Sequence, residues 1–187
     1  MVSIEILKYT FGKNKIEDYL DCLNKFHDIA DYITINISSP NTEDLRKLHD
    51  EDKLEKLLNL IDKTKKELKT KIPIVIKISP DIDDDQINLI SEILLGNDIK
   101  AIIVSNTSEF SRDKLSNIQR HQKGGLSGKP IEDISNILIS KFYKLLKGKI
   151  RIIGVGGVDS AQAAYTKFMA GADLVQLYTG MVFKGPN

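Results

Sequence analysis

The sequence is poor in several residue types, and each shortage excludes a class of protein. Its single cysteine, Cys22, excludes an internal disulfide and a cysteine-rich zinc site, so a reducing compartment is expected. Lys and Arg number 27 against 26 Asp and Glu, which leaves no basic surface for nucleic acid. No apolar run reaches the roughly 20 residues of a membrane-spanning helix, and the N-terminus lacks the pattern of a signal peptide. We therefore expect a soluble globular chain of one domain.

The sequence does contain an alternation of apolar strands and amphipathic helices. Runs of β-branched residues predict the strands, and apolar residues spaced by three or four predict the helices. The predicted strands are 33–37, 71–80, 100–106, 150–157 and 173–179, and the predicted helices are 16–30, 50–69, 83–97, 131–147 and 160–172. This order is typical of a parallel sheet covered by helices. A TIM barrel and a doubly wound open sheet both fit it.

Polar residues interrupt the apolar pattern where the strands end. Asn36 lies inside the run "ITINISSPNT", where an unpaired buried amide would cost on the order of 1–3 kcal/mol, so we expect it to have hydrogen-bond partners. An edge strand with Asn36 on its solvent face is the alternative. Other strand ends carry Ser38–Ser39, Lys77, Ser105–Asn106–Thr107, Gly156–Gly157 and Tyr178–Thr179. In a parallel barrel this end of the sheet forms the active site.

Lys77 and the glycine-rich turns are the sharpest of these signals. Lys77 lies among β-branched residues in "IVIKIS", where a buried ammonium needs a negative partner, unless the side chain reaches past the sheet to water. The turns "GVGGVDS" and "YTG" indicate an anion site, because glycines let main-chain amides approach a phosphate. The glycine pattern alone is weak, since it does not match the GxGxxG fingerprint and such turns are common.

Six motifs, in this order, resemble the class 2 dihydroorotate dehydrogenases, the quinone-linked FMN enzymes of pyrimidine biosynthesis. They are "NISSPNT", "VIKISPD", "VSNT", "GGLSGKP", "IIGVGGVDS" and "LVQLYTGMVFKGP". The resemblance implies an α/β fold, the TIM (β/α)8 barrel, with about six of its eight βα units present in one partial FMN-binding domain, residues 1–187. It also implies oxidation of dihydroorotate to orotate, with quinone as the electron acceptor.

The resemblance assigns roles to residues at matching positions. Ser39 would be the base that takes a proton from C5 of dihydroorotate, and serine here, where the class 1 enzymes carry cysteine, indicates class 2. Asn36 would bond the flavin and the substrate, and Lys77 would place its cation beside the flavin ring. The other substrate contacts would be Asn41, Asn106 and Thr107, and the other FMN contacts Ser105, Gly128, Gly157, Tyr178 and Thr179. No metal is implied.

The sequence also departs from the family. Thr10 stands where the family has an asparagine that contacts FMN. A complete barrel needs about 250 residues, so we expect truncation at both ends, with the first two strands and the quinone-tunnel helices missing. In the full-length protein that N-terminal region would reach quinone and attach peripherally to the cytoplasmic face of a bacterial inner membrane, or to the mitochondrial inner membrane in a eukaryote.

Two other functions stay open at this stage. One is an inactive remnant, or a partner-dependent half barrel, that keeps only the phosphate and flavin site. The other is a different TIM-barrel enzyme with a phosphate ligand, such as an isomerase, which would need a carboxylate or histidine base. His27, His49 and His121 fall away from the strand ends, which disfavours that enzyme, and we expect all three to face solvent.

Overall fold

The computed structural model describes residues 3–6, 16–38, 51–109, 112 and 115–186. In these ranges six parallel strands form one sheet, in which every strand pairs with its neighbours along the chain. They are β1 (Ser3–Ile6), β2 (Tyr32–Asn36), β3 (Ile74–Lys77), β4 (Ala101–Val104), β5 (Arg151–Val155) and β6 (Leu174–Gln176). A doubly wound sheet reverses its strand order at a switch point, and this sheet does not. The open-sheet alternative is therefore wrong.

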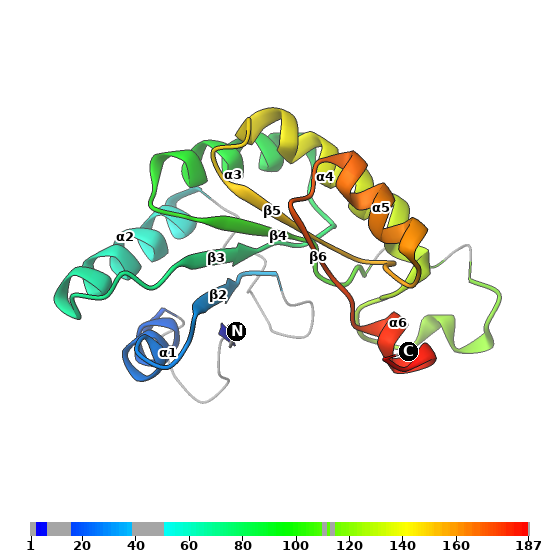
Figure 1. The fold of residues 1–187 in the computed structure, drawn as a ribbon, viewed down its shortest axis with the longest axis horizontal. Helices are drawn as coiled ribbons and strands as arrows, with labels where there is room; N and C mark the ends of the chain where they lie inside the picture. Colours follow the sequence, from blue (N-terminus) through cyan, green and yellow to red (C-terminus); the bar gives the residue numbers. More distant parts are fainter. Residues whose placement is uncertain (1–2, 7–15, 39–50, 110–111, 113–114, 187) are drawn as a thin grey trace.

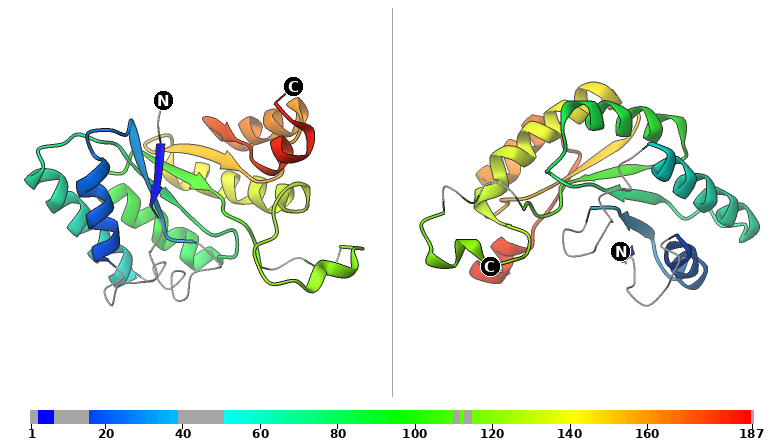
Figure 2. Two further views of the ribbon diagram at one scale, coloured as in Figure 1. Left: turned by 90° about the horizontal axis from the view of Figure 1, so that it is seen from below. Right: turned by 180° about the vertical axis from the view of Figure 1, so that it is seen from behind.

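The sheet curls like part of a barrel, with helices along its convex side (Figure 1). They are α1 (Glu17–Phe26), α2 (Glu51–Glu67), α3 (Asp84–Gly96), α4 (Glu132–Leu146) and α5 (Ala161–Ala170). Seen from behind, α2 to α5 form an arch outside the strands (Figure 2). Among the described residues, no helix is both long and apolar enough to cross a bilayer.

The helices form where the sequence predicts them. In α3, the side chain of Asp83 accepts from the N–H of Gln86 at 2.8 Å, and the side chain of Gln86 accepts from the N–H of Asp83 at 3.2 Å. This capping box satisfies two N–H groups that the first turn leaves free. Cys22 lies on α1, partly buried against the core. Burial raises the pKa of its thiol.

Three features of the fold differ from the prediction. The last strand ends at Gln176, so Tyr178 and Thr179 follow it instead of closing it. Thr179 begins a short helix that was not predicted, α6 (Thr179–Lys184), and two 3-10 turns, η2 (Ile118–His121) and η3 (Lys129–Ile131), were also missed. Strand β1 precedes the predicted elements, and Thr10 lies outside the described residues.

The two faces of the sheet carry different side chains. Ile33, Ile35 and Ile76 pack with the helices in the main core and are almost fully buried. Since successive side chains of a strand alternate between faces, Asn36 and Lys77 point to the concave face. They are paired in register on β2 and β3, and Glu5 on β1 is paired with Thr34, so Glu5 points to the same face.

Candidate active site

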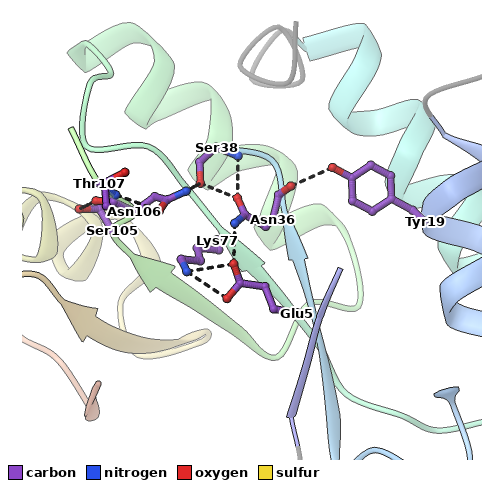
Figure 3. A network of polar contacts seen from close by, with 8 residues as sticks. All are labelled: Glu5, Tyr19, Asn36, Ser38, Lys77, Ser105, Asn106 and Thr107. Carbon is purple, nitrogen blue, oxygen red and sulfur yellow. Dashed lines mark hydrogen bonds and ion pairs between the residues drawn. The ribbon is translucent and has the colours of Figure 1, made fainter. Parts of the chain in front are cut away.

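The carboxyl ends of the central strands carry a connected polar network on the concave face (Figure 3). Asn36, the buried amide noted in the sequence, has every polar group of its side chain bonded. Its Nδ2 donates to Glu5 Oε1 at 2.5 Å, and its Oδ1 accepts from the backbone N–H and the hydroxyl of Ser38 at 2.9 and 2.8 Å. Its backbone carbonyl accepts from the hydroxyl of Tyr19 at 2.8 Å. The prediction that Asn36 is bonded is confirmed, and the solvent-facing alternative is wrong.

The ammonium of Lys77 has the negative partner that its position requires. Its Nζ lies 3.0 Å from both carboxylate oxygens of Glu5, and its side chain is only 16% exposed. Glu5 therefore joins Asn36 and Lys77, which otherwise sit side by side on adjacent strands. Glu5 was not predicted, although a carboxylate inside the apolar strand "SIEI" is the same kind of signal as the lysine inside "IVIKIS".

The segment after β4 extends this network across the sheet. Asn106 Nδ2 donates to Ser38 Oγ at 3.0 Å, while Asn106 Oδ1 accepts from the N–H of Thr107 at 2.9 Å. The N–H of Ser105 donates to the carbonyl of Val155 at 3.2 Å, which ties the end of β4 to the end of β5. Three strand ends that are far apart in sequence are thus held together by side-chain and main-chain bonds.

Beside the network lies a cavity of about 460 Å³. The predicted residues that line it are Lys77, Ser105, Asn106, Thr107, Gly128, Gly157, Tyr178 and Thr179. Two loops and the first turn of α6, each with glycine, form much of its wall, and we call Gly128, Gly156, Gly157 and Gly180 the glycine cradle. Asn36 does not line the cavity, but it reaches Lys77 through Glu5.

Glycine is required at the cradle because the loops touch. A Cβ on Gly157 would lie 2.4 Å from Cβ and 2.8 Å from Cα of Glu132, and its φ of +76° is one that other residues rarely adopt. A Cβ on Gly180 would lie 2.6 Å from the carbonyl oxygen of Val158. A Cβ on Gly128 would lie 2.9 Å from the methyl carbon of Thr179. The segments at Gly128, Gly157 and Gly180 are therefore packed around one space.

Charged pairs surround the rim of the cavity. Lys129 pairs with Glu132, and Lys184 bonds Asp159 Oδ2 at 3.1 Å and the Asp159 carbonyl at 2.8 Å. The hydrogen bond to Glu132 raises the pKa of Lys129, and the bond from Lys184 lowers the pKa of Asp159. An anion entering this space would find two ammonium groups at its edge and one, Lys77, deeper inside.

The remaining predicted residues are placed elsewhere or not described. Ser39, Asn41 and His49 lie outside the described residues. His121 is exposed as expected, but His27 is half-buried after the end of α1, and neither lines the cavity. No cluster of three or more His, Cys, Asp or Glu side chains suited to a metal occurs in the described part of the chain.

Comparison with known proteins identifies the family. The family model for dihydroorotate dehydrogenase matches residues 2–187. A protein of Idiomarina loihiensis named dihydroorotate dehydrogenase (quinone) is 44% identical over 97% of this chain and 58% of its own length. Its namesake from Bartonella tribocorum is 48% identical over 93% of this chain and 49% of its own length.

Solved structures agree with these relatives. A crystal structure of DHODH from Eimeria tenella in complex with ferulenol has a TM-score of 0.89 and 30% identity to this chain, covering 96% of it and 52% of that protein. The curled sheet described above is thus part of the same TIM-barrel fold. The chain spans about half the length of the curated relatives it matches. It belongs to the dihydroorotate dehydrogenase family.

Proposed function

We propose that this chain supplies the FMN site and part of the substrate site of a quinone-dependent dihydroorotate dehydrogenase, which oxidises dihydroorotate to orotate in pyrimidine biosynthesis. The observation that carries the proposal is the single cavity lined by Lys77, by the polar segment after β4 and by the glycine cradle. Those residues come from separate parts of the sequence, and the family resemblance had assigned them to FMN and to the substrate that reacts with it.

The cavity suits FMN in size and in chemistry. Its volume of about 460 Å³ falls in the range of roughly 300–1,000 Å³ that is usual for cofactor sites. Positive φ angles at Gly156 and Gly157 and the tight contact at Gly180 let main-chain amides come close to a phosphate group. We propose that Gly128, Gly157, Tyr178 and Thr179 hold the phosphate and ribityl end, and that Ser105 and Lys77 hold the ring end.

Each polar side chain has a chemical task in this proposal. When bound, FMN supplies the acceptor for the hydride that leaves C6 of dihydroorotate. Lys77 holds a cation where negative charge develops on the flavin side, and Glu5 keeps that ammonium in place. Asn36, Asn106 and Thr107 orient the substrate together with Asn41.

In this proposal Ser39 is the base that removes the proton from C5 of dihydroorotate. Serine is a weak base at its ordinary pKa, so it needs a dry pocket and a relay through water or a neighbouring hydroxyl. Quinone would accept the electrons through an N-terminal region of the kind that the full-length relatives have. We propose that the same N-terminal region attaches the full-length protein peripherally to a membrane.

The test is anaerobic mixing of a protein of its relatives' full length that contains this sequence with FMN and dihydroorotate. FMN binding is followed by quenching of flavin fluorescence, and reduction by loss of yellow absorbance. If Ser39 is the base, Ser39→Ala retains the bound flavin but slows its reduction by roughly 10²–10⁴-fold, the usual contribution of a positioned base. Ser38→Ala, one residue away, measures how far a disturbance of this segment alone slows the reaction, because its hydroxyl bonds Asn36 and Asn106 and is not the proposed base. Equal reduction rates for Ser39→Ala and the unchanged chain would reject the assignment.

A further inference from the structure

One buried charge lies outside the site described above. Lys167, on α5, has a side chain and backbone that are 0% exposed, which is rare for lysine. Its Nζ donates to Ser135 Oγ and to Asn136 Oδ1, both at 3.0 Å and both on α4. The two helices lie next to each other outside β5 and β6 (Figure 1). Its two hydrogen-bond acceptors are neutral, so these bonds do not cancel its charge.

The bonds continue from Lys167 to the glycine cradle. Ser135 Oγ donates to the carbonyl of Val155 at 2.5 Å, and the N–H of Ser105 donates to that carbonyl at 3.2 Å. The Val155 carbonyl and the Gly156 N–H belong to one peptide group, and in a trans peptide they point in opposite directions. Fixing the carbonyl on α4 and β4 therefore fixes the direction of the Gly156 N–H, which belongs to the cavity wall.

The packing behind the cradle leaves little room for this peptide to move. A Cβ on Gly156 would lie 3.3 Å from Ser135 Cβ, and a Cβ on Gly154 would lie 3.0 Å from Cδ of Lys167. The lysine stem thus lies against β5 itself, in the space that Gly154 leaves free. Within the described residues, the N–H groups of Gly156 and Gly157 have no hydrogen-bond partner, so they are available to a ligand.

We propose that Lys167 is a positioning residue for the cradle: its ammonium holds the Ser135 hydroxyl, which holds the Val155–Gly156 peptide with its N–H toward a phosphate monoester dianion. The proposal rests on the FMN site proposed above and adds what selects the phosphorylated ligand. An apolar side chain would fill the same space at lower cost, since an ammonium in a dry interior must give up its hydration. The ammonium also adds a positive charge behind the site, where little water screens it.

The electrostatics of the position agree with this role. Burial lowers the pKa of Lys167 to about 8, and the carboxylate of Glu132 offsets part of that effect. Glu132 is in turn paired with Lys129 at the rim of the cavity. Lys167 is therefore mostly protonated at neutral pH. The ammonium can then donate to both Ser135 and Asn136 and also carry the positive charge that the proposal requires.

The first experiment needs no ligand. The experiment compares amide hydrogen exchange at Ser105 and at Ile78. The N–H of Ser105 donates to the Val155 carbonyl of β5, and the N–H of Ile78 donates to the Ile103 carbonyl of β4, away from Ser135. Lys167→Met and Ser135→Ala should each speed exchange at Ser105 about tenfold and leave Ile78 unchanged. Ser135→Ala removes one oxygen only and serves if the lysine variant does not fold. Unchanged exchange at Ser105 in both variants would overturn the proposal.

The second experiment measures dissociation constants of FMN and of riboflavin, which lacks the phosphate, by fluorescence quenching. Lys167→Met should weaken FMN about tenfold and riboflavin less than about twofold, and adding Ser135→Ala should cost little more. Lys65→Met is the matched control, because Lys65 is also buried but bonds Asp98 at 3.2 Å on another part of the fold. Equal weakening of both flavins would overturn the proposal. If the unchanged chain binds neither flavin even at concentrations where it is monomeric, the proposed FMN site fails, and the exchange at Ser105 alone decides the role of Lys167.

Discussion

At the scale of single residues, the sequence predicted which polar side chains are unusual but not which ones meet. Asn36 and Lys77 stand out because each lies among β-branched residues, where burial without a partner is costly. Their common partner, Glu5, is 31 residues from Asn36 and 72 from Lys77 along the chain. No local pattern encodes such a contact. Only the register of three strands brings the three side chains to one face.

Replacing Lys77 tests whether its charge serves the flavin. Lys77→Met removes the ammonium and leaves the carboxylate of Glu5 without its cation, so FMN binding or flavin reduction should fall by roughly tenfold. In a protein of its relatives' full length that contains this sequence, absorbance gives the flavin content, and stopped-flow reduction by dihydroorotate gives the rate. Glu5→Gln is the matched control, since it breaks the ion pair but keeps the lysine. Flavin content and rate both unchanged in Lys77→Met would reject the role.

The buried charge of Lys167 predicts a pH dependence of stability. Its folded pKa of about 8 lies below the ordinary value of 10.5, so between these pH values the unfolded chain binds a proton that the folded chain does not. Stability therefore rises with pH across this interval, by an amount on the order of 3 kcal/mol. Urea unfolding at pH 7.5 and pH 10 should show this rise in the unchanged chain relative to Lys167→Met. Parallel pH profiles for the two proteins would contradict the assignment.

At the scale of elements, the loop after β5 shows how far a motif can be interpreted. The glycines of "GVGG" predicted close approach of main chain to an anion. The structure adds that the same glycines make room for the first turn of α4, through Glu132 and Ser135. The sequence does not contain this second reason, because the first turn of α4 lies more than twenty residues before the loop and meets it only after the chain has returned through β5. The short helix α6 was missed for a related reason, since six residues offer too little periodicity to recognise.

Replacing Gly157 tests the cradle as an element. Gly157→Val should lower FMN occupancy, because its Cβ would overlap Glu132 and its φ of +76° is unfavourable for a β-branched residue. The strain should cost about 1–3 kcal/mol of stability. Gly148→Val is the matched control, because Gly148 has a φ of +73° but nothing within 4 Å of its Cβ position. Flavin absorbance after gel filtration should fall for Gly157→Val and not for Gly148→Val. Equal occupancy in the two variants would argue against the cradle.

At the scale of the whole molecule, the alternation of strands and helices predicted the layers but not the curl. An open sheet and a barrel share that alternation, and what separates them is the order of pairing, which depends on contacts between distant segments. The family resemblance supplied the barrel, and the consecutive order β1 to β6 agrees with it. The early end of β6 was not predictable from composition, because Val, Tyr and Thr, which favour strands, occur to the end of "LVQLYT".

The last prediction concerns self-association of the purified chain. Within the described residues β1 and β6 each pair with one strand only, and unpaired strand edges invite pairing with other chains. Near β6, exposed apolar side chains gather, among them Leu174, Tyr178 at 79% and Phe183 at 84%. We expect the 187-residue chain to associate at micromolar concentration. We also expect it to retain little FMN, because a second chain packed on Tyr178 would block the cavity that this residue lines.

Sedimentation velocity over a range of concentrations measures this association. Leu174→Lys places a charge on the β6 edge and should shift the population toward monomer. Ile118→Lys is the control, since Ile118 is 92% exposed but lies on η2, outside the sheet. A chain that stays monomeric and yellow at all concentrations, and bleaches with dihydroorotate, would contradict the prediction. It would also mean that the six strands β1 to β6 are enough to hold the flavin. Flavin binding would then depend on the glycine cradle and not on closure of the sheet.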